Sequence, residues 1–438
     1  MVMAPPTFPA RGGPVSRRLL AALAAACLGL LVAPEPRLQA SSACQVASAA
    51  VPAAASGAQP PGPAPSPLWP DEAALAQVSP ELLEQLRSDP YVYFRFINRQ
   101  WTRRVCERFT DVIPSLTTVR LHGDAHLEQY AYTDVDRGLD DFDDSATGPS
   151  VVDVSRFLAS VDLVLRRHGW SGAYPTAAEA FLAGYRKGLT VEGYLPPDPA
   201  IVTRLRQRPR RDTVAFLQWA DSLMLPLADD AAKLVPTVEA AIDEFSRRMR
   251  PGLPRDYFRI KRSGHLKLGV GSALTTKVLL RVEGPSPAAE DDVVIEAKRA
   301  SSLGGVPCLT VPPAAEAVRV VAGTRQIGRL HNEVLMVLPK LGTAEFGTWW
   351  VRSWSPSYVE VDIDDYISPD EIVEVAHDVG AQLGSRNLRD DSPQAQAQGR
   401  RAEGQTVEQL ERRIRDGVAD LTAELFEAWS RFRARPVP

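Results

Sequence analysis

The segment from His122 to Asp144 reads HGDAHLEQYAYTDVDRGLDDFDD and contains two acidic groups of interest, the motif with Asp124 between His122 and His126 and the run from Asp140 to Asp144. Clustered carboxylates repel one another, so a folded protein keeps them close only where a cation or a proton compensates their charge. The first group directly follows Thr118–Leu121, whose residues are typical of a short strand. We therefore expect the chemistry of this protein to be centred on this segment.

The residue types in the segment suit phosphoryl transfer, which needs one aspartate near the hydroxyl proton and another that holds Mg²⁺ against nucleotide phosphates. Asp124 is the candidate base, and His122 and His126 on either side of it complete the candidate catalytic set. The candidate metal ligands are Gln129, Asp141 and Asp143. Gln129 is the fifth residue after Asp124, where the kinase catalytic loop places a metal-binding asparagine. A solvated acidic loop with a capping aspartate is the alternative interpretation.

A second motif lies downstream, in a region rich in β-branched and apolar residues. A turn containing Gly269, Gly271 and Ser272 joins two predicted strands, and a third predicted strand ends at Lys298. Glycines let backbone N–H groups approach phosphates, and a lysine pairs with phosphate oxygens. Glu316, on the helix expected next, is a candidate to orient Lys298. Together these residues predict a nucleotide-binding sheet, although each alone is typical of a hairpin turn or a surface lysine.

The two motifs together resemble the kinase-like superfamily in its aminoglycoside-phosphotransferase branch. More closely, residues from about Tyr91 to Leu388 are similar to a bacterial family known only as domain of unknown function 2252. The matching stretches are Tyr93–Phe96, Gly123–Leu127, Asp141–Asp143, Gly148–Pro149, Asp153–Ser160, Gly269–Ser272, the strand with Lys298, and Arg319–Arg325. The resemblance implies ATP and Mg²⁺ as cofactors. Gln129 and Asn387 depart from it, because an asparagine and a histidine are expected there.

The order of the motifs is inverted relative to an ordinary kinase, in which the glycine-rich sheet precedes the catalytic aspartate. A circular permutation explains the inversion, since chain ends usually lie at the surface and permutation is tolerated. The Val373–Leu388 helix then resembles the helix that leads into the catalytic loop, and Thr348–Asp364 becomes the hinge. The predicted fold is therefore α+β, a two-lobed protein-kinase-like fold that is circularly permuted.

The length of 438 residues and a composition that is 45% hydrophobic and 24% charged are typical of a globular protein. A net charge of −4 gives no indication of a nucleic-acid partner or an anionic membrane surface. We expect a helical catalytic-loop lobe over 76–255, a β-rich nucleotide lobe over 256–365, and C-terminal helices over 366–438 that complete the helical lobe. A polar, mobile connection is predicted over Asp390–Gly404. Cys106 and Cys308 could pair in an exported protein, but their spacing does not decide this.

Residues 1–40 are typical of a signal peptide or a membrane anchor. Arg17 and Arg18 precede an unbroken apolar run from Leu19 to Ala33, which is shorter than the roughly 20 residues of a membrane span. Residues 41–75 are rich in alanine and proline and predict a disordered linker. We expect an exported or membrane-anchored protein, or a cytoplasmic one if the leader results from a misplaced start codon.

Three functions stay open. The first is a phosphotransferase that moves the γ-phosphoryl group of ATP to a hydroxyl of a small molecule or a protein. The second is a non-catalytic nucleotide-binding pseudokinase, favoured by Gln129 and by the leader, because an exported kinase would meet little ATP. The third is a phosphohydrolase with a transition metal bound by His122, Asp124, His126 and Asp141.

Overall fold

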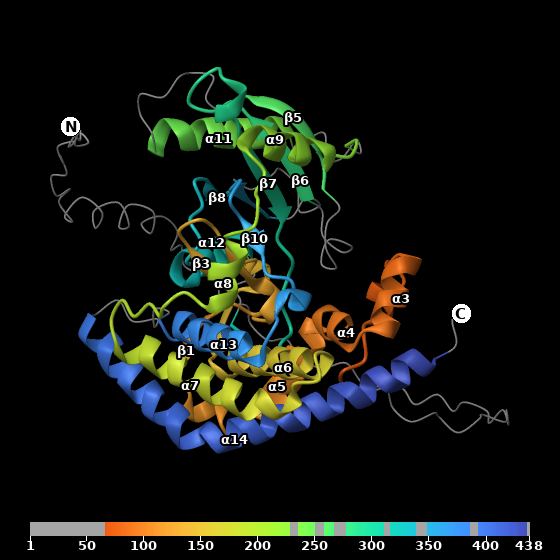
Figure 1. The fold of residues 1–438 in the computed structure, drawn as a ribbon, viewed down its shortest axis with the longest axis vertical. Coiled ribbons are helices and arrows are strands. Elements are labelled where there is room, and N and C mark those ends of the chain that lie inside the picture. The colour runs from red at the N-terminus through yellow and green to blue at the C-terminus, as the bar shows by residue number, and fades with distance from the viewer. Residues whose placement is uncertain are drawn as a thin grey trace, which may run out of the picture. The chain divides into compact units, whose positions relative to one another are not determined.

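The structure is a computed structural model, and it describes residues 66–227, 235–249, 258–266, 277–310, 316–338, 348–385 and 393–435. These residues form helices and antiparallel sheets (Figure 1), which confirms the predicted α+β class. Within these ranges no helix is both long enough and apolar enough to span a membrane. The predicted leader over 1–40 lies outside the described residues.

The helices come both before and after the strands of the largest sheet (Figure 1). Their bounds are α2 (Glu72–Leu75), α3 (Pro80–Ser88), α4 (Pro90–Phe96), α5 (Asn98–Arg108), α6 (Val151–Arg167), α7 (Tyr174–Thr190), α8 (Ala200–Leu205), α9 (Thr213–Ser222), α11 (Val235–Met249), α12 (Glu316–Ile327), α13 (Pro369–Gly384) and α14 (Pro393–Ala434). Asp89 separates α3 from α4, because its side chain accepts a hydrogen bond of 2.7 Å from the backbone N–H of Tyr91 and so caps the second helix.

The described strands form three antiparallel sheets. β1 (Thr118–Leu121) pairs with β4 (Ala146–Pro149), and β2 (Tyr130–Tyr132) lies between β10 (Val359–Glu360) and β3 (Arg137–Leu139). The third sheet has the order β5 (Ile260–His265), β6 (Lys277–Val282), β7 (Val293–Arg299), β9 (Trp349–Trp354), β8 (Leu335–Val337). The Asp124 segment thus lies between β1 and β2, and the acidic segment from Asp140 to Asp144 lies between β3 and β4.

The five-stranded sheet has two different faces, because successive side chains of a strand point to opposite sides. Val278, Leu280, Ile295 and Val351 pack on one side with Ile242 of α11. Leu279 and Val294 pack on the other side with Phe216 and Leu217 of α9. Helices α9 and α11, which lie within the range 76–255 predicted as a helical lobe, thus pack on this sheet (Figure 1).

Helices α7 and α13 approach each other through glycines. A Cβ at Gly184 would lie 2.1 Å from the carbonyl oxygen of His377, and one at Gly380 would lie 2.1 Å from that of Phe181. The two backbones are in direct contact at these positions, and only glycine permits that approach. Next to this contact, Gln382 of α13 accepts a hydrogen bond of 2.8 Å from the backbone N–H of β3. Helix α13 therefore lies beside the hairpin that follows the Asp124 segment.

Two predicted segments differ in the structure. Residues 66–75, assigned to the disordered linker over 41–75, include the fully buried Leu68 and helix α2, so the folded part begins before residue 76. Helix α14 begins at Pro393, so most of the connection predicted over Asp390–Gly404 is helical rather than mobile.

The structure also decides whether the two cysteines pair, which the sequence left open. Cys106 of α5 forms a disulfide with Cys308, which ties α5 to the segment after β7.

Candidate functional site

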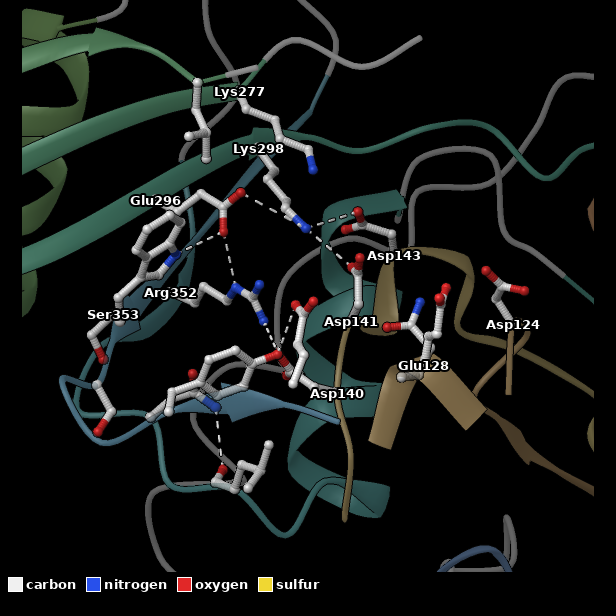
Figure 2. Close-up of a pocket in the computed structure, with 18 of the residues that line it drawn as sticks. Asp124, Glu128, Asp140, Asp141, Asp143, Lys277, Glu296, Lys298, Arg352 and Ser353 are labelled. Carbon is white, nitrogen blue, oxygen red and sulfur yellow. Dashed lines mark hydrogen bonds and ion pairs between the residues drawn. The ribbon is translucent and has the colours of Figure 1, made fainter. Parts of the chain in front are cut away.

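A cavity of about 750 Å³ brings together residues from both predicted motifs (Figure 2). Its lining includes Asp124, Gln129, Asp141, Asp143 and Lys298, all of which the sequence singled out. Residues of the five-stranded sheet that the sequence did not assign also line it, among them Lys277, Glu296 and Arg352. Gly269, Gly271 and Ser272 lie outside the described residues, so the predicted glycine turn stays a prediction.

Lys298 of β7 lies between carboxylates from two different parts of the chain (Figure 2). Its Nζ is 3.1 Å from Oδ1 of Asp141, 3.1 Å from Oδ2 of Asp143 and 3.9 Å from Oε1 of Glu296. Burial of the side chain, which is 1% exposed, would lower its pKa, but the three carboxylates raise the pKa above its ordinary value. Lys298 is therefore a cation that compensates the charge of the acidic segment.

The acidic segment has an uncommon backbone. Asp141 adopts φ 56° and ψ 72°, the left-handed region that few residues other than glycine occupy, and Phe142–Asp144 then forms one 3₁₀ turn. This turn buries Phe142 and directs the carboxylates of Asp141 and Asp143 to the same ammonium. Burial and the neighbouring Asp141 raise the pKa of Asp143 to about 7. For Asp141, burial would raise the pKa, but Lys298, Lys277 and Arg352 together outweigh it, and the pKa is well below the ordinary value.

The sheet supports Lys298 through a second carboxylate–cation pair. Glu296, which is 2% exposed, accepts hydrogen bonds of 3.0 Å from Nε of Arg352 and 3.0 Å from the indole N–H of Trp354. Arg352 also donates to Asp140 over 2.6 Å, so it joins the sheet to the acidic segment. Burial would raise the pKa of Glu296, but Lys298 and Arg352 outweigh it and lower the pKa to about 2.

Glu316, predicted to orient Lys298, has a different partner in the structure. Its carboxylate lies 2.6 Å from Nε of Arg319 on the same helix. Among the ion pairs of the described residues, the glutamate that pairs with Lys298 is Glu296. Arg319 in turn donates to the carbonyl oxygens of Asp143 and Ser145. Glu316 thus supports the acidic turn indirectly, because it orients the arginine that binds the backbone of that turn.

Asp124 is paired with a buried arginine. Its Oδ1 accepts from Nε of Arg156 at 2.9 Å and lies 2.8 Å from Nη2, while its Oδ2 is 3.5 Å from Nε2 of His126. Burial would raise the pKa of Asp124, but Arg156 and His126 lower it to about 2. Burial also lowers the pKa of His126 to about 4, against the opposing effect of Asp124. At neutral pH Asp124 is thus a carboxylate and His126 is neutral.

Buried polar groups hold the Asp124 loop in place. Asp153 of α6 accepts from the backbone N–H of His122 at 2.8 Å and of Gly123 at 2.9 Å. Gly123 has φ +86°, and a Cβ there would lie 1.9 Å from the carbonyl oxygen of Asp144, so only glycine fits. The fully buried ring of His122 contacts the carbonyl oxygen of Asp140 through Nε2 at 2.8 Å. His122 therefore joins the Asp124 loop to the acidic segment and lies inside the protein.

The sequence matches a bacterial protein family over residues 76–195 and 201–435, which is more than half of the chain. That family is described as "Uncharacterized protein conserved in bacteria (DUF2252)". The chain belongs to the DUF2252 family. No curated protein and no solved structure matches it. The DUF2252 match includes Asp124, the acidic segment and Lys298, whereas residues 1–40 lie outside the matched residues.

The donor atoms at the acidic turn fit a hard cation such as Mg²⁺, which prefers carboxylate oxygens and usually retains several waters. Oδ1 of Asp143 is buried and has no hydrogen-bond partner among the residues that the structure describes, so it is available as a ligand. Within the described ranges no group of three or more His, Cys, Asp or Glu side chains forms a metal cluster by itself. A cation held by Asp141 and Asp143 would take its other ligands from bound phosphates, from water, or from Gln129 across the cavity.

Proposed function

We propose that this protein is an ATP- and Mg²⁺-dependent phosphotransferase with a circularly permuted, kinase-like arrangement of two lobes. The observation that carries the proposal is the position of Lys298, 3.1 Å from both Asp141 and Asp143 in a cavity that Asp124 also lines. A nucleotide-gripping lysine, metal-binding carboxylates and a carboxylate for the acceptor are the parts that phosphoryl transfer uses. The apolar clusters that pack α9 and α11 on the five-stranded sheet, apart from the large cluster of the other helices, support the two lobes.

The sheet side of the cavity supplies the nucleotide subsite in this proposal. Asp141 and Asp143 would hold Mg²⁺, which would supply compensation for the negative charge of the nucleotide phosphates. Without nucleotide, Lys298 compensates these two carboxylates. Phosphate oxygens would compete for its ammonium, and Glu296 would keep it charged and directed into the cavity.

The loop side supplies the acceptor subsite. The acceptor oxygen attacks the γ-phosphorus, the bond from that phosphorus to the ADP oxygen breaks, and the hydroxyl proton passes to Asp124 as the new bond forms. A carboxylate with a pKa of about 2 is a weak base, so Asp124 first accepts a hydrogen bond that orients the hydroxyl and takes up the proton only as the bond to phosphorus is completed. Arg156 fixes the Asp124 carboxylate for this role through its contacts at 2.9 and 2.8 Å.

A non-catalytic nucleotide-binding protein is the second candidate. The ion pair of Asp124 with Arg156 favours it, because a carboxylate so strongly stabilised in its charged form has little affinity for a proton. The phosphohydrolase alternative has less support. Nε2 of His122 lies 2.8 Å from the carbonyl oxygen of Asp140, and its Nδ1 accepts from the backbone N–H of Asp124 at 3.2 Å, so both ring nitrogens already have partners.

Calorimetric titration with Mg-ATP tests the proposal. Lys298→Ala and Asp141→Ala should each weaken binding by tenfold or more, and the Asp141 variant should also lose the dependence on Mg²⁺. Lys187→Ala is the matched control, since this lysine lies on α7 and its ammonium is over the ring of Tyr194. Unchanged affinity in Lys298→Ala would remove the kinase-like interpretation. Binding without transfer to any acceptor would instead support the non-catalytic candidate.

A further inference from the structure

Two arginines of α5 reach the segment that follows β7. Arg99 and Arg103 are exposed and lie four residues apart, so they share one face of the helix. Arg99 donates to the carbonyl oxygen of Gly304 and lines the same cavity as Asp124. A Cβ at Gly305 would lie 3.9 Å from Nη2 of Arg99 and 3.8 Å from Nη2 of Arg103, so both guanidiniums converge on one point of the backbone.

The backbone at that point is held in place. Gly305 has φ +80°, a conformation that favours glycine, so the chain passes the two guanidiniums without a side chain between them. The disulfide between Cys106 and Cys308 fixes the same segment to α5. Cys106 lies three residues after Arg103, and Cys308 lies three residues after Gly305. The disulfide and the conformation of Gly305 therefore fix the position of this turn relative to the two arginines.

Within the described part of the chain, no acidic side chain pairs with these two arginines. Neighbouring arginines on α4 and α5 form ion pairs, Arg95 with Glu128, Arg104 with Glu424 and Arg108 with Asp420. Among the described residues, neither Arg99 nor Arg103 has an ion-pair partner. Two guanidiniums directed at one place repel each other, and an oxyanion between them relieves that repulsion through charge-assisted, forked hydrogen bonds.

We propose that Arg99, Arg103 and the turn at Gly304 and Gly305 bind an oxyanion group of the acceptor, a phosphate monoester or a carboxylate. The acceptor role rests on the proposed function, because Arg99 shares its cavity with Asp124. An anionic group held at Arg99 leaves the rest of the acceptor inside that cavity, where its hydroxyl can reach Asp124. The substrate class is therefore a hydroxyl compound that already carries a negative charge.

Calorimetric titration of the nucleotide-free full chain tests this site, with inorganic phosphate and succinate as probes at constant ionic strength. The double variant Arg99→Ala/Arg103→Ala should bind the preferred probe at least about tenfold more weakly, as expected for lost charged hydrogen bonds. The matched control is Arg248→Ala/Arg431→Ala, which removes two exposed arginines from other helices. Preference for phosphate over succinate identifies a phosphorylated acceptor, and the reverse identifies a carboxylate.

A third variant separates this site from the nucleotide site. Phosphate binding that is lost in Lys298→Ala but unchanged in Arg99→Ala/Arg103→Ala would overturn the inference, as would a wild-type chain that binds neither probe. Mg-ATP affinity should be unchanged in the arginine double variant, since Asp141 and Lys298 are intact. Anion binding at the arginines without any Mg-ATP binding would keep the oxyanion site and refute the phosphotransferase, so the two failures are distinguishable.

Discussion

The two sides of the cavity hold their charges by different means. On the sheet side, antiparallel register places Glu296 opposite Arg352 and Lys277 opposite Lys298, so regular backbone spacing brings the charges together. On the loop side, an irregular chain carries Asp124, and Asp153 holds that chain by accepting hydrogen bonds from the backbone N–H groups of His122 and Gly123. The sheet side is thus rigid by secondary structure, whereas the loop side depends on buried polar contacts.

The two sides also differ in the charged neighbours of their aspartates, and these neighbours shift the pKa values of Asp143 and Asp124 in opposite directions. Asp143 has another carboxylate, Asp141, as its neighbour, and its pKa is raised to about 7. Asp124 has the guanidinium of Arg156 as its neighbour, and its pKa is lowered to about 2. The nucleotide side therefore needs a further cation, whereas the acceptor side is already compensated.

The largest expected effect is on the loop side. Asp124→Asn should lower the rate of phosphoryl transfer by about 10²–10⁴-fold, because the amide cannot accept the hydroxyl proton. Mg-ATP affinity should stay within twofold, since Asp141 and Lys298 are unchanged. Steady-state transfer assays and nucleotide titration measure the two quantities. Asp134→Asn serves as a control, because Asp134 is exposed in the β2–β3 turn and pairs with Arg210. Equal rates in the two variants would assign Asp124 a structural role.

The next effect tests whether buried contacts hold the loop side. Asp153→Ala removes the acceptor of two hydrogen bonds, at 2.8 and 2.9 Å, and leaves the N–H groups of His122 and Gly123 buried. Charge-assisted bonds contribute roughly 1.5–3 kcal/mol each, so the free energy of unfolding should fall by about 3–6 kcal/mol. Urea unfolding measures it. Asp111→Ala is the control, because Asp111 is exposed and pairs with Arg413 at the surface. A loss as small as that of the control would contradict the assigned role.

The parts that could be predicted from the sequence are those with a regular period or a compact motif. The strand over Val293–Lys298 was predicted because β-branched and apolar residues run through it, and it forms most of β7. The Asp124 and Asp141 motifs were found because each is compact in sequence, with Asp124 between His122 and His126 and Asp141 within the acidic run Asp140–Asp144. The three-residue strands β2 and β3 were missed, because so few residues give no periodic pattern.

The missed site residues have partners that are remote in sequence. Arg352 reaches Asp140 across 212 positions, and nothing near either residue indicates the other. Arg156 was part of the recognised helix pattern, but its partner Asp124 is on another element. Glu296 could have been found, because it lies two residues before Lys298 and must share its face of the strand. Glu316 was predicted to orient Lys298 instead, because it lies on the helix expected after this strand.

The smallest expected effect tests the sheet side through its pH dependence. The pKa of Glu296 falls from its ordinary value of 4.5 to about 2 on folding, so its ionised form stabilises the native state above pH 4.5. That contribution, about 3 kcal/mol from the size of the shift, is lost as the pH falls from 4.5 toward 2. Glu296→Gln should therefore be less stable than wild type at pH 6, and the difference should shrink toward pH 3. Urea unfolding over this range measures the difference.

The control is Glu427→Gln, at an exposed pair on α14, whose stability difference from wild type should not shrink in this way. A constant difference between Glu296→Gln and wild type at all pH values would show that Glu296 acts through packing and hydrogen bonding alone.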